Sequence, residues 1–211
     1  EAVTSEAARP LQILAGPGSG KTRVLTSRVA HLVRDSAAPI APERCVVVTF
    51  TNRAANEMRA RLETMIGADR TRRLVLGTFH AVCVRFLRRW GARCLGLDPR
   101  FTIADTDDAR RLLRDVDRDA PVDATLAAIS RAKAHGWTPD ELRASAQHAP
   151  GSPAHTEHLA LCRTYAAYQQ QLRTSHALDF DDLLLLGVRL FREHPELTTH
   201  IDHVLVDEFQ D

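Results

Sequence analysis

Lysine is almost absent from this 211-residue sequence. Of the 28 lysine and arginine residues only two are lysine, Lys21 and Lys133. Arginine meets carboxylates and phosphates with a planar, two-pronged guanidinium, whereas the lysine ammonium is a compact point charge. A lysine in such a chain indicates a position where the compact charge matters, and Lys21 directly follows a glycine-rich stretch.

The sequence also lacks long apolar runs and closely spaced cysteine pairs. No apolar run approaches the ~20 residues needed to span a bilayer, and residues 1–5 have neither the basic nor the apolar region of a signal peptide. We therefore expect an intracellular protein with no membrane partner. The cysteines form no Cys-x-x-Cys pair, so we expect reduced, largely buried thiols; they are Cys45, Cys83, Cys94 and Cys162.

The formal net charge of +1 hides an uneven distribution of charge. Between Arg53 and Arg100 there are eleven arginines and four acidic residues, whereas between Asp105 and Asp182 there are thirteen acidic and nine basic residues. A basic segment of this kind suits a surface that meets a polyanion such as nucleic acid. A solvated basic face without a ligand is the alternative.

The stretch from Leu11 to Thr22 predicts a nucleotide-phosphate loop. Ile13 and Leu14 are expected to form a buried strand, the glycines let backbone N–H groups turn inward, and a helix is expected to begin at about Lys21. The helix N-terminus favours an anion, Lys21 would meet the β- and γ-phosphates, and the Thr22 hydroxyl would bind Mg²⁺. Ala15 stands where the usual pattern has glycine.

Further strands and helices alternate along the chain. Apolar, β-branched runs predict strands at residues 45–50, 74–79 and 204–206, and helical spacing predicts helices after the first two. This order is typical of a parallel sheet with helices on its faces. Between residues 98 and 177 we find no convincing strand and expect a helical insertion, with helices at 106–116, 124–134, 139–146 and 153–174; another helix follows at 180–191.

Two acidic residues, Asp207 and Glu208, follow the last strand. The carboxyl ends of strands are where ligands of open α/β sheets lie. Asp207 is expected to hold Mg²⁺ opposite Thr22, and Glu208 to orient and deprotonate a water molecule in line with the γ-phosphate, which would make the reaction hydrolysis. A pair of surface acids after a strand is the alternative.

At this point the sequence resembles the UvrD/PcrA/Rep group of superfamily 1A DNA helicases, over essentially the whole chain. The motifs that carry the resemblance stand in the family's order; they are residues 15–23 (AGPGSGKTR), 49–58 (TFTNRAANEM), 77–80 (GTFH), 178–184 (LDFDDLL) and 206–211 (VDEFQD).

The resemblance implies a RecA-like P-loop NTPase fold. Residues 1–97 and 178–211 would form motor domain 1A, ending at the Walker B strand, and residues 98–177 the helical 1B insertion. It also implies ATP and Mg²⁺ as cofactors, 3′→5′ translocation on single-stranded DNA, and unwinding at single-strand/double-strand junctions in DNA repair, replication or recombination. The resemblance also implies a C-terminal motor domain (2A/2B) beyond these residues. We therefore expect the 211-residue chain to be nearly inactive alone. The setting would be a bacterial cytoplasm or a eukaryotic nucleus.

The resemblance further assigns roles to individual residues. Lys21, Asp207 and Glu208 would be catalytic, Thr22 and Asp207 would bind the metal, and Gln210 would couple nucleotide to DNA. The nucleotide-binding residues would be Ala15, Gly16, Pro17, Gly18, Ser19, Gly20, Lys21, Thr22 and Arg23.

The resemblance places the DNA contacts in three segments, which contain Phe50, Thr51, Asn52, Thr78, Phe79, His80 and Lys133. An aromatic residue beside Thr and Asn at a strand end suits base stacking and phosphate contacts. For Phe50 and Phe79 the alternative is core packing at a strand end; for Lys133 it is a solvated helix lysine.

Two polar clusters admit a metal interpretation that we consider weaker than an ordinary one. Asp179, Asp181 and Asp182 precede or open a helix, where carboxylates cap free N–H groups. His148, His155 and His158 have no cysteine nearby to complete a zinc site. Three functional alternatives also stay open: a translocase that strips proteins from DNA, as an anti-recombinase does, a DNA-binding module with a vestigial ATPase, and a helicase–nuclease subunit.

Overall fold

The computed structural model describes residues 2–4, 10–16, 18–146, 149 and 151–209. The chain divides into two compact units: unit 1 comprises Glu1–Val82 and His194–Asp211, and unit 2 comprises Cys83–Glu193. The predicted domain limits, at residues 97/98 and 177/178, differ from these unit limits and stay predictions. Within the described residues, no helix has the length and apolar character needed to cross a membrane.

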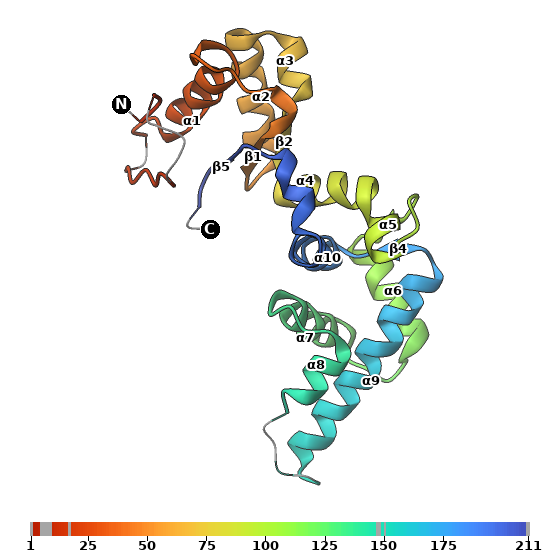
Figure 1. The fold of residues 1–211 in the computed structure, drawn as a ribbon. Helices are drawn as coiled ribbons and strands as arrows, with labels where there is room; N and C mark the ends of the chain where they lie inside the picture. Colours follow the sequence, from red (N-terminus) through yellow and green to blue (C-terminus); the bar gives the residue numbers. More distant parts are fainter. Residues whose placement is uncertain (1, 5–9, 17, 147–148, 150, 210–211) are drawn as a thin grey trace. The chain divides into compact units, whose positions relative to one another are not determined.

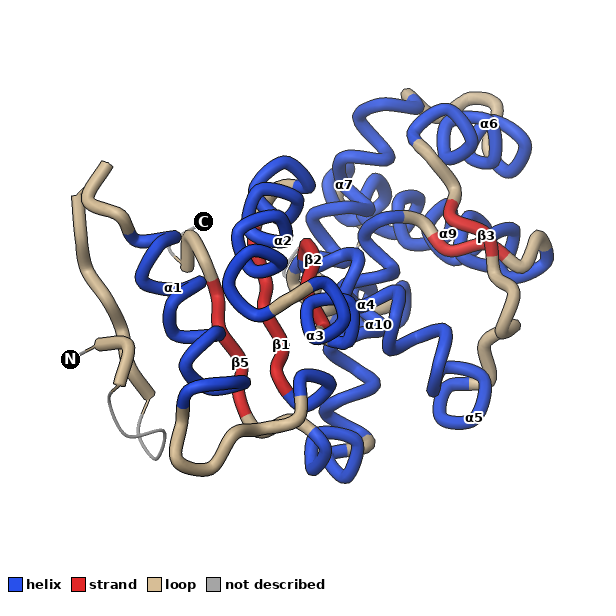
Figure 2. Tube along the Cα trace, turned by 90° about the horizontal axis from the view of Figure 1, so that it is seen from above, coloured by secondary structure: helices blue, strands red, loops and turns tan. Residues whose placement is uncertain are grey.

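Unit 1 contains a parallel sheet of three strands. β1 (Cys45–Thr49) lies in the centre, with β2 (Val75–Thr78) on one side and β5 (His203–Val206) on the other, as Figure 2 shows. This confirms the three strands predicted there and their parallel order. Because the strands are parallel and in register, the segments that follow them emerge at one edge of the sheet.

Helices α1 and α2 cover one face of this sheet (Figure 1). The apolar stripe of α1 (Lys21–Ala30) and of α2 (Asn52–Ile66) packs on the strands, as the helical spacing predicts. The side chains that form this core are Val29, Val33, Val47, Met58, Leu62 and Leu76, among others. The other helical segments of the unit are η1 (His31–Asp35), η2 (Pro42–Arg44), α3 (Ala68–Arg73) and η4 (Pro195–His200).

The predicted strand at Ile13–Leu14 is not formed. The described part of residues 10–20 contains no strand, and the Leu14 side chain is 85% exposed. A strand needs a hydrogen-bonding neighbour, and within the described residues β5 pairs only with β1, so its other edge is open. β1 and β2 are buried along their whole length, whereas β5 is not: Val204 on β5 is 60% exposed.

Unit 2 is helical, as predicted for the insertion. Its helices are α4 (Phe79–Phe86, which begins in unit 1), η3 (Leu87–Gly91), α5 (Ala92–Leu95), α6 (Thr106–Val116), α7 (Val122–Ala134), α8 (Pro139–Ala144), α9 (Pro153–Thr174) and α10 (Phe180–Glu193). The sequence missed one short pairing of parallel strands, which joins β3 (Thr102–Ile103) and β4 (Ala177–Leu178).

The longest helix of unit 2, α9, packs against both α6 and α8 (Figure 1). Tyr165, Tyr168 and Leu172 on α9 are buried with Leu113 of α6 and Ile129 of α7. α6 begins with a capping box in which the Asp105 side chain accepts from the N–H groups of the first turn. Local capping and one apolar stripe per helix therefore define this unit.

Candidate nucleotide-binding site

The glycine-rich loop is shaped by two residues in the left-handed conformation. Gly18 has φ of 73° and Gly20 has φ of 90°, values that residues with a side chain seldom adopt. The Ser19 hydroxyl and N–H both donate to the Gly16 carbonyl, at 2.6 and 3.3 Å, which closes the turn. Helix α1 then begins at Lys21 with no side-chain cap on its N-terminus. Its first N–H groups therefore remain available for an anion. Pro17 lies outside the described residues.

The acidic pair lies beside this helix start. β5 positions it, because the Asp207 N–H donates to the Val48 carbonyl on β1 at 2.8 Å. The Thr22 hydroxyl lies close enough to the Asp207 carboxylate to lower the pKa of that group, and the Lys21 Nζ lies 3.9 Å from Glu208 Oε2. The structure therefore brings Lys21, Thr22, Asp207 and Glu208 together, although about 185 residues separate the two pairs in sequence.

Asp207 is only 6% exposed. Burial raises the pKa of its carboxyl group, and the neighbouring Glu208 charge raises it further, while the Thr22 hydrogen bond and the Lys21 charge lower it. A buried carboxylate of this kind is stabilised by a nearby cation. The hydroxyl of Thr22 and the carboxylate of Asp207 are neighbouring hard oxygen donors, and such donors fit Mg²⁺.

The backbone at Glu208 adopts a left-handed conformation, with φ of 52°. A residue with a side chain in this region stores strain, and strain of this kind gathers at functional sites. The turn directs the chain away from β5 immediately after Asp207 and leaves the Glu208 carboxylate facing Lys21. Nothing in the sequence signals this conformation. Gln210 lies outside the described residues.

The predicted DNA contacts of unit 1 follow the ends of β1 and β2. Phe50 is 61% exposed and Phe79 43% exposed, so neither residue is packed into the core. The alternative of core packing is therefore wrong. Asn52 is exposed as well, and His80 is half-buried.

Two threonines and one arginine complete these predictions. The Thr51 hydroxyl accepts from the Ala54 N–H at 3.1 Å and caps α2. Thr78 is buried, and its hydroxyl accepts from the Ala81 N–H at 3.3 Å. Both hydroxyls therefore already have a partner in the chain. Because Thr78 is also buried, the structure favours a direct DNA contact less for Thr78 than for the exposed Thr51. Arg23, predicted near the base or ribose, is exposed on α1.

Lys133 is not a surface residue. Its side chain is fully buried, and its Nζ lies 2.6 Å from Asp179 Oδ2 and 2.8 Å from Asp182 Oδ1. The predicted DNA contact is therefore wrong, and so is the alternative of a solvated lysine. The physical reason is that α7 packs against α10, so that the ammonium balances the carboxylates at the start of that helix.

The aspartates around α10 cap the helix, as expected. The Asp182 N–H donates to Asp179 Oδ1 at 2.8 Å, and the Asp179 N–H donates to Asp182 Oδ2 at 3.3 Å. Among the described residues, no three histidine, cysteine or acidic side chains are grouped to hold a metal ion. A ring nitrogen of His158 lies 2.9 Å from the Leu142 carbonyl; His148 falls outside the described part of the chain.

The structure combines a parallel sheet, a glycine-rich loop that leads into a helix, and a buried Asp followed by Glu directly after β5. This combination is typical of nucleoside-triphosphate-binding α/β proteins. A family model, the UvrD/REP helicase N-terminal domain, matches residues 1–211. The chain belongs to this family.

Several curated relatives are similar to this chain. The ATP-dependent DNA helicase PcrA of Leuconostoc citreum is 40% identical over 213 residues, which cover 96% of this chain and 27% of the relative. The PcrA protein of Staphylococcus epidermidis is 37% identical over 222 residues, covering 98% and 29%. That of Staphylococcus aureus is 37% identical over 213 residues, covering 96% and 28%. The chain thus spans less than a third of the length of these relatives.

Proposed function

We propose that this chain is the ATP-binding N-terminal part of an ATP-dependent 3′→5′ DNA helicase or single-stranded DNA translocase. One observation carries the proposal: Lys21 and Thr22, at the start of α1, lie beside Asp207 and Glu208, at the end of β5. The family match supports it. Action at single-strand/double-strand junctions in DNA repair, replication or recombination, with a C-terminal motor domain (2A/2B) as partner, is part of the same proposal.

The phosphates of ATP would bind at the N-terminus of α1, where backbone N–H groups and Lys21 supply positive charge. Thr22 and Asp207 would hold Mg²⁺. When bound, the ion neutralises negative charge on the β- and γ-phosphate oxygens.

Glu208 would act as the general base toward a water molecule. Its carboxylate now has the Lys21 ammonium 3.9 Å away. A triphosphate would offer the same ammonium a stronger partner, because it carries several negative charges. Arrival of the phosphates would therefore draw Lys21 from Glu208 and remove the positive charge that lowers the tendency of this carboxylate to accept a proton from water.

Single-stranded DNA would cross the edge of the sheet where β1 and β2 end. Phe50 and Phe79 are exposed there and suit base stacking, which contributes ~1–3 kcal/mol per base. Asn52, exposed beside Phe50, suits a phosphate or base edge. The nucleotide and the DNA would then contact residues that end adjacent strands of one sheet.

Binding of a fluorescent ATP analogue without DNA, followed by DNA-stimulated hydrolysis, tests this function in the full-length protein. We expect K21A to weaken analogue binding strongly, and E208Q to leave binding intact while lowering turnover by about 10²–10⁴-fold. R61A, which removes an exposed charge on α2, is the charge-matched control for binding. Unchanged affinity in K21A would overturn the nucleotide site.

The vestigial-ATPase alternative predicts DNA binding without hydrolysis. The close placement of Lys21, Thr22, Asp207 and Glu208 weighs against it. Unwinding of a naked fork, compared with displacement of a protein from single-stranded DNA, would separate a helicase from a protein-stripping translocase.

A further inference from the structure

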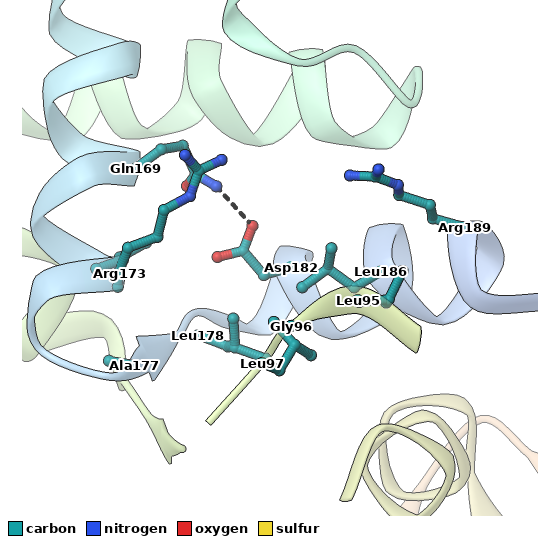
Figure 3. Close-up of a pocket in the computed structure, with 11 residues that line it drawn as sticks. Leu95, Gly96, Leu97, Gln169, Arg173, Ala177, Leu178, Asp182, Leu186 and Arg189 are labelled. Atoms are coloured by element: carbon teal, nitrogen blue, oxygen red, sulfur yellow. Dashed lines mark hydrogen bonds between the residues drawn. The ribbon is translucent and has the colours of Figure 1, made fainter. Parts of the chain in front are cut away.

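Unit 2 contains a pocket of about 280 Å³ between the segment that ends α5, helix α9 and helix α10 (Figure 3). This volume is close to the lower end of the range of roughly 300–1,000 Å³ that is typical of small-molecule sites. Leucine side chains form much of its lining; they are Leu95, Leu97, Leu172, Leu178 and Leu186. The pocket therefore offers an apolar surface beside polar groups.

A buried hydrogen-bond acceptor belongs to the lining. The Gln169 Nε2 donates to Asp182 Oδ1 at 3.2 Å, as the dashed line in Figure 3 marks. If the Gln169 amide were turned over, its oxygen would face the Asp182 carboxylate and the two would repel. The hydrogen bond therefore fixes which end of the Gln169 amide faces Asp182. Within the described residues, Gln169 Oε1 is buried and has no hydrogen-bond partner. Such an acceptor is stabilised by a ligand that carries an N–H or O–H group.

Two arginines give the pocket a positive rim. Arg173 extends from α9 and Arg189 from α10, and Figure 3 shows their guanidinium groups on opposite sides of the pocket, with Asp182 between them. Arg173 is exposed, and the Arg189 Nε donates to Glu193 at 2.7 Å while its side chain stays 55% exposed. Both guanidiniums therefore retain N–H groups for a ligand.

The carboxylate of Asp182 does not cancel this positive charge. Its side chain is 2% exposed and lies 2.8 Å from the Lys133 ammonium, which it shares with Asp179, so the Asp182 charge is buried and partly offset from the side of α7. The exposed charges at the rim are thus those of Arg173 and of Arg189, and Arg189 is paired with Glu193. A planar guanidinium matches phosphate oxygens in pairs, so a phosphate suits the rim better than a single carboxylate does.

We propose that this pocket takes one nucleotide unit of a nucleic-acid strand. The phosphate binds between Arg173 and Arg189, the base lies on the leucine surface, and an N–H on the base edge donates to Gln169 Oε1. An anion, an apolar planar body and a hydrogen-bond donor are together the three features of a nucleotide. The proposal rests on the DNA-binding function proposed above, and it adds a strand contact in unit 2, where Lys133 alone was expected to meet DNA.

The test uses the full-length protein and an oligodeoxythymidylate, whose bases carry an N–H, in the absence of ATP. The R173A/R189A variant is compared with R163A/R192A, which removes two exposed arginines from the same two helices outside the pocket. We expect R173A/R189A to lower affinity at least tenfold relative to this control. The slope of log K against log salt should fall by about 0.7, the value for one phosphate contact on a single strand.

The outcomes separate this proposal from the proposed function. Equal affinity of the two double variants, with strong binding by the unaltered protein, overturns the pocket alone. Failure of the unaltered protein to bind the oligomer overturns both. Thymidine monophosphate provides the second arm: if it binds the protein and R173A/R189A abolishes that binding while strand affinity stays at the control value, the site takes a free nucleotide and the strand proposal is overturned.

Discussion

Lys133 shows how a single buried charge is accommodated in unit 2. Its ammonium has two carboxylate neighbours, Asp179 and Asp182, and Tyr168 donates its hydroxyl hydrogen to Asp179 Oδ2 at 3.0 Å. The rings of Tyr165 and Tyr168 lie within 5.9 and 5.5 Å of the ammonium. Burying charges is unfavourable unless each is paired and hydrogen-bonded, and here the partners come from α7, α9 and α10. The cluster therefore connects three helices through one side chain.

Replacing Lys133 by methionine should strongly destabilise unit 2. K133M would leave two buried carboxylates without a cation, and breaking a buried pair in this way typically costs about 3–5 kcal/mol. R131M, an exposed arginine two residues earlier on the same helix, should change the free energy of unfolding by less than about 0.5 kcal/mol. Urea unfolding followed by circular dichroism measures both. Equal midpoints for the two variants would show that the pair contributes nothing.

The destabilisation by K133M should also depend on pH. Burial raises the pKa of the Asp182 carboxyl above its ordinary value of 3.8, and the Lys133 charge opposes that rise. K133M removes the positive charge that lowers this pKa. The Asp182 carboxylate of the folded protein then binds a proton more readily than the same group of the unfolded chain does. The cost is then fully present above the raised pKa and is relieved as pH falls through it toward 3.8. The difference in free energy of unfolding between K133M and R131M should therefore become smaller as the pH is lowered from 8 to 5. A difference that does not change with pH would contradict this.

Among the secondary-structure elements, those with local signals could be predicted and those with distant partners could not. The predicted bounds of α6 and α9 agree with the structure because Asp105 and Ser152 cap them and an apolar stripe continues to their ends. The strand expected at Ile13–Leu14 fails because a strand depends on a neighbour that the local pattern does not specify. β3 and β4 were missed for the same reason, since each has two residues and pairs across more than seventy positions.

The candidate site divides in the same way. The glycine loop and the Asp207–Glu208 pair each have a local pattern, and parallel-sheet geometry brings the two together. The ion pair of Lys133 joins residues 46 positions apart, and lysine on a short helical segment gives no sign of burial. The left-handed backbone of Glu208 is likewise a property of the folded chain.

The contact between α4 and α10 depends on a glycine. A Cβ added at Gly187 would lie 2.7 Å from Cys83 Sγ and 3.2 Å from Cys83 Cβ. Glycine to alanine inside a helix normally stabilises by roughly 0.5–1 kcal/mol, but here the overlap should outweigh that gain and destabilise by about 1–3 kcal/mol. C83A removes the sulfur, so G187A/C83A should recover much of the loss. Thermal unfolding of the two single variants and the double variant tests this, and simple additivity would argue against the contact.

At the scale of the whole molecule, β5 has one edge without a partner strand among the described residues, and it also exposes an apolar side chain. Val204 is 60% exposed, and an unpaired edge of this kind promotes strand pairing between molecules. V204K should therefore reduce self-association of the 211-residue chain in sedimentation at rising concentration. V188K is the matched control, because Val188 is 55% exposed but lies on α10, where backbone groups are paired within the helix. If V204K and V188K reduce self-association equally, exposed apolar side chains and not strand pairing at β5 would explain the association.

A further prediction concerns how ATP binding and ATP hydrolysis depend on the rest of the full-length protein. This chain covers 27–29% of the length of its PcrA relatives, and it contains the proposed phosphate loop, the proposed Mg²⁺ ligands and the candidate base. If an arginine from the second motor domain stabilises the transition state, its absence costs about 10³–10⁵ in turnover. The 211-residue chain should then bind an ATP analogue within about tenfold of the full-length protein and hydrolyse ATP at least ~10³-fold more slowly. Hydrolysis by the chain at the full-length rate, lost in E208Q, would show that the site in unit 1 needs no second domain.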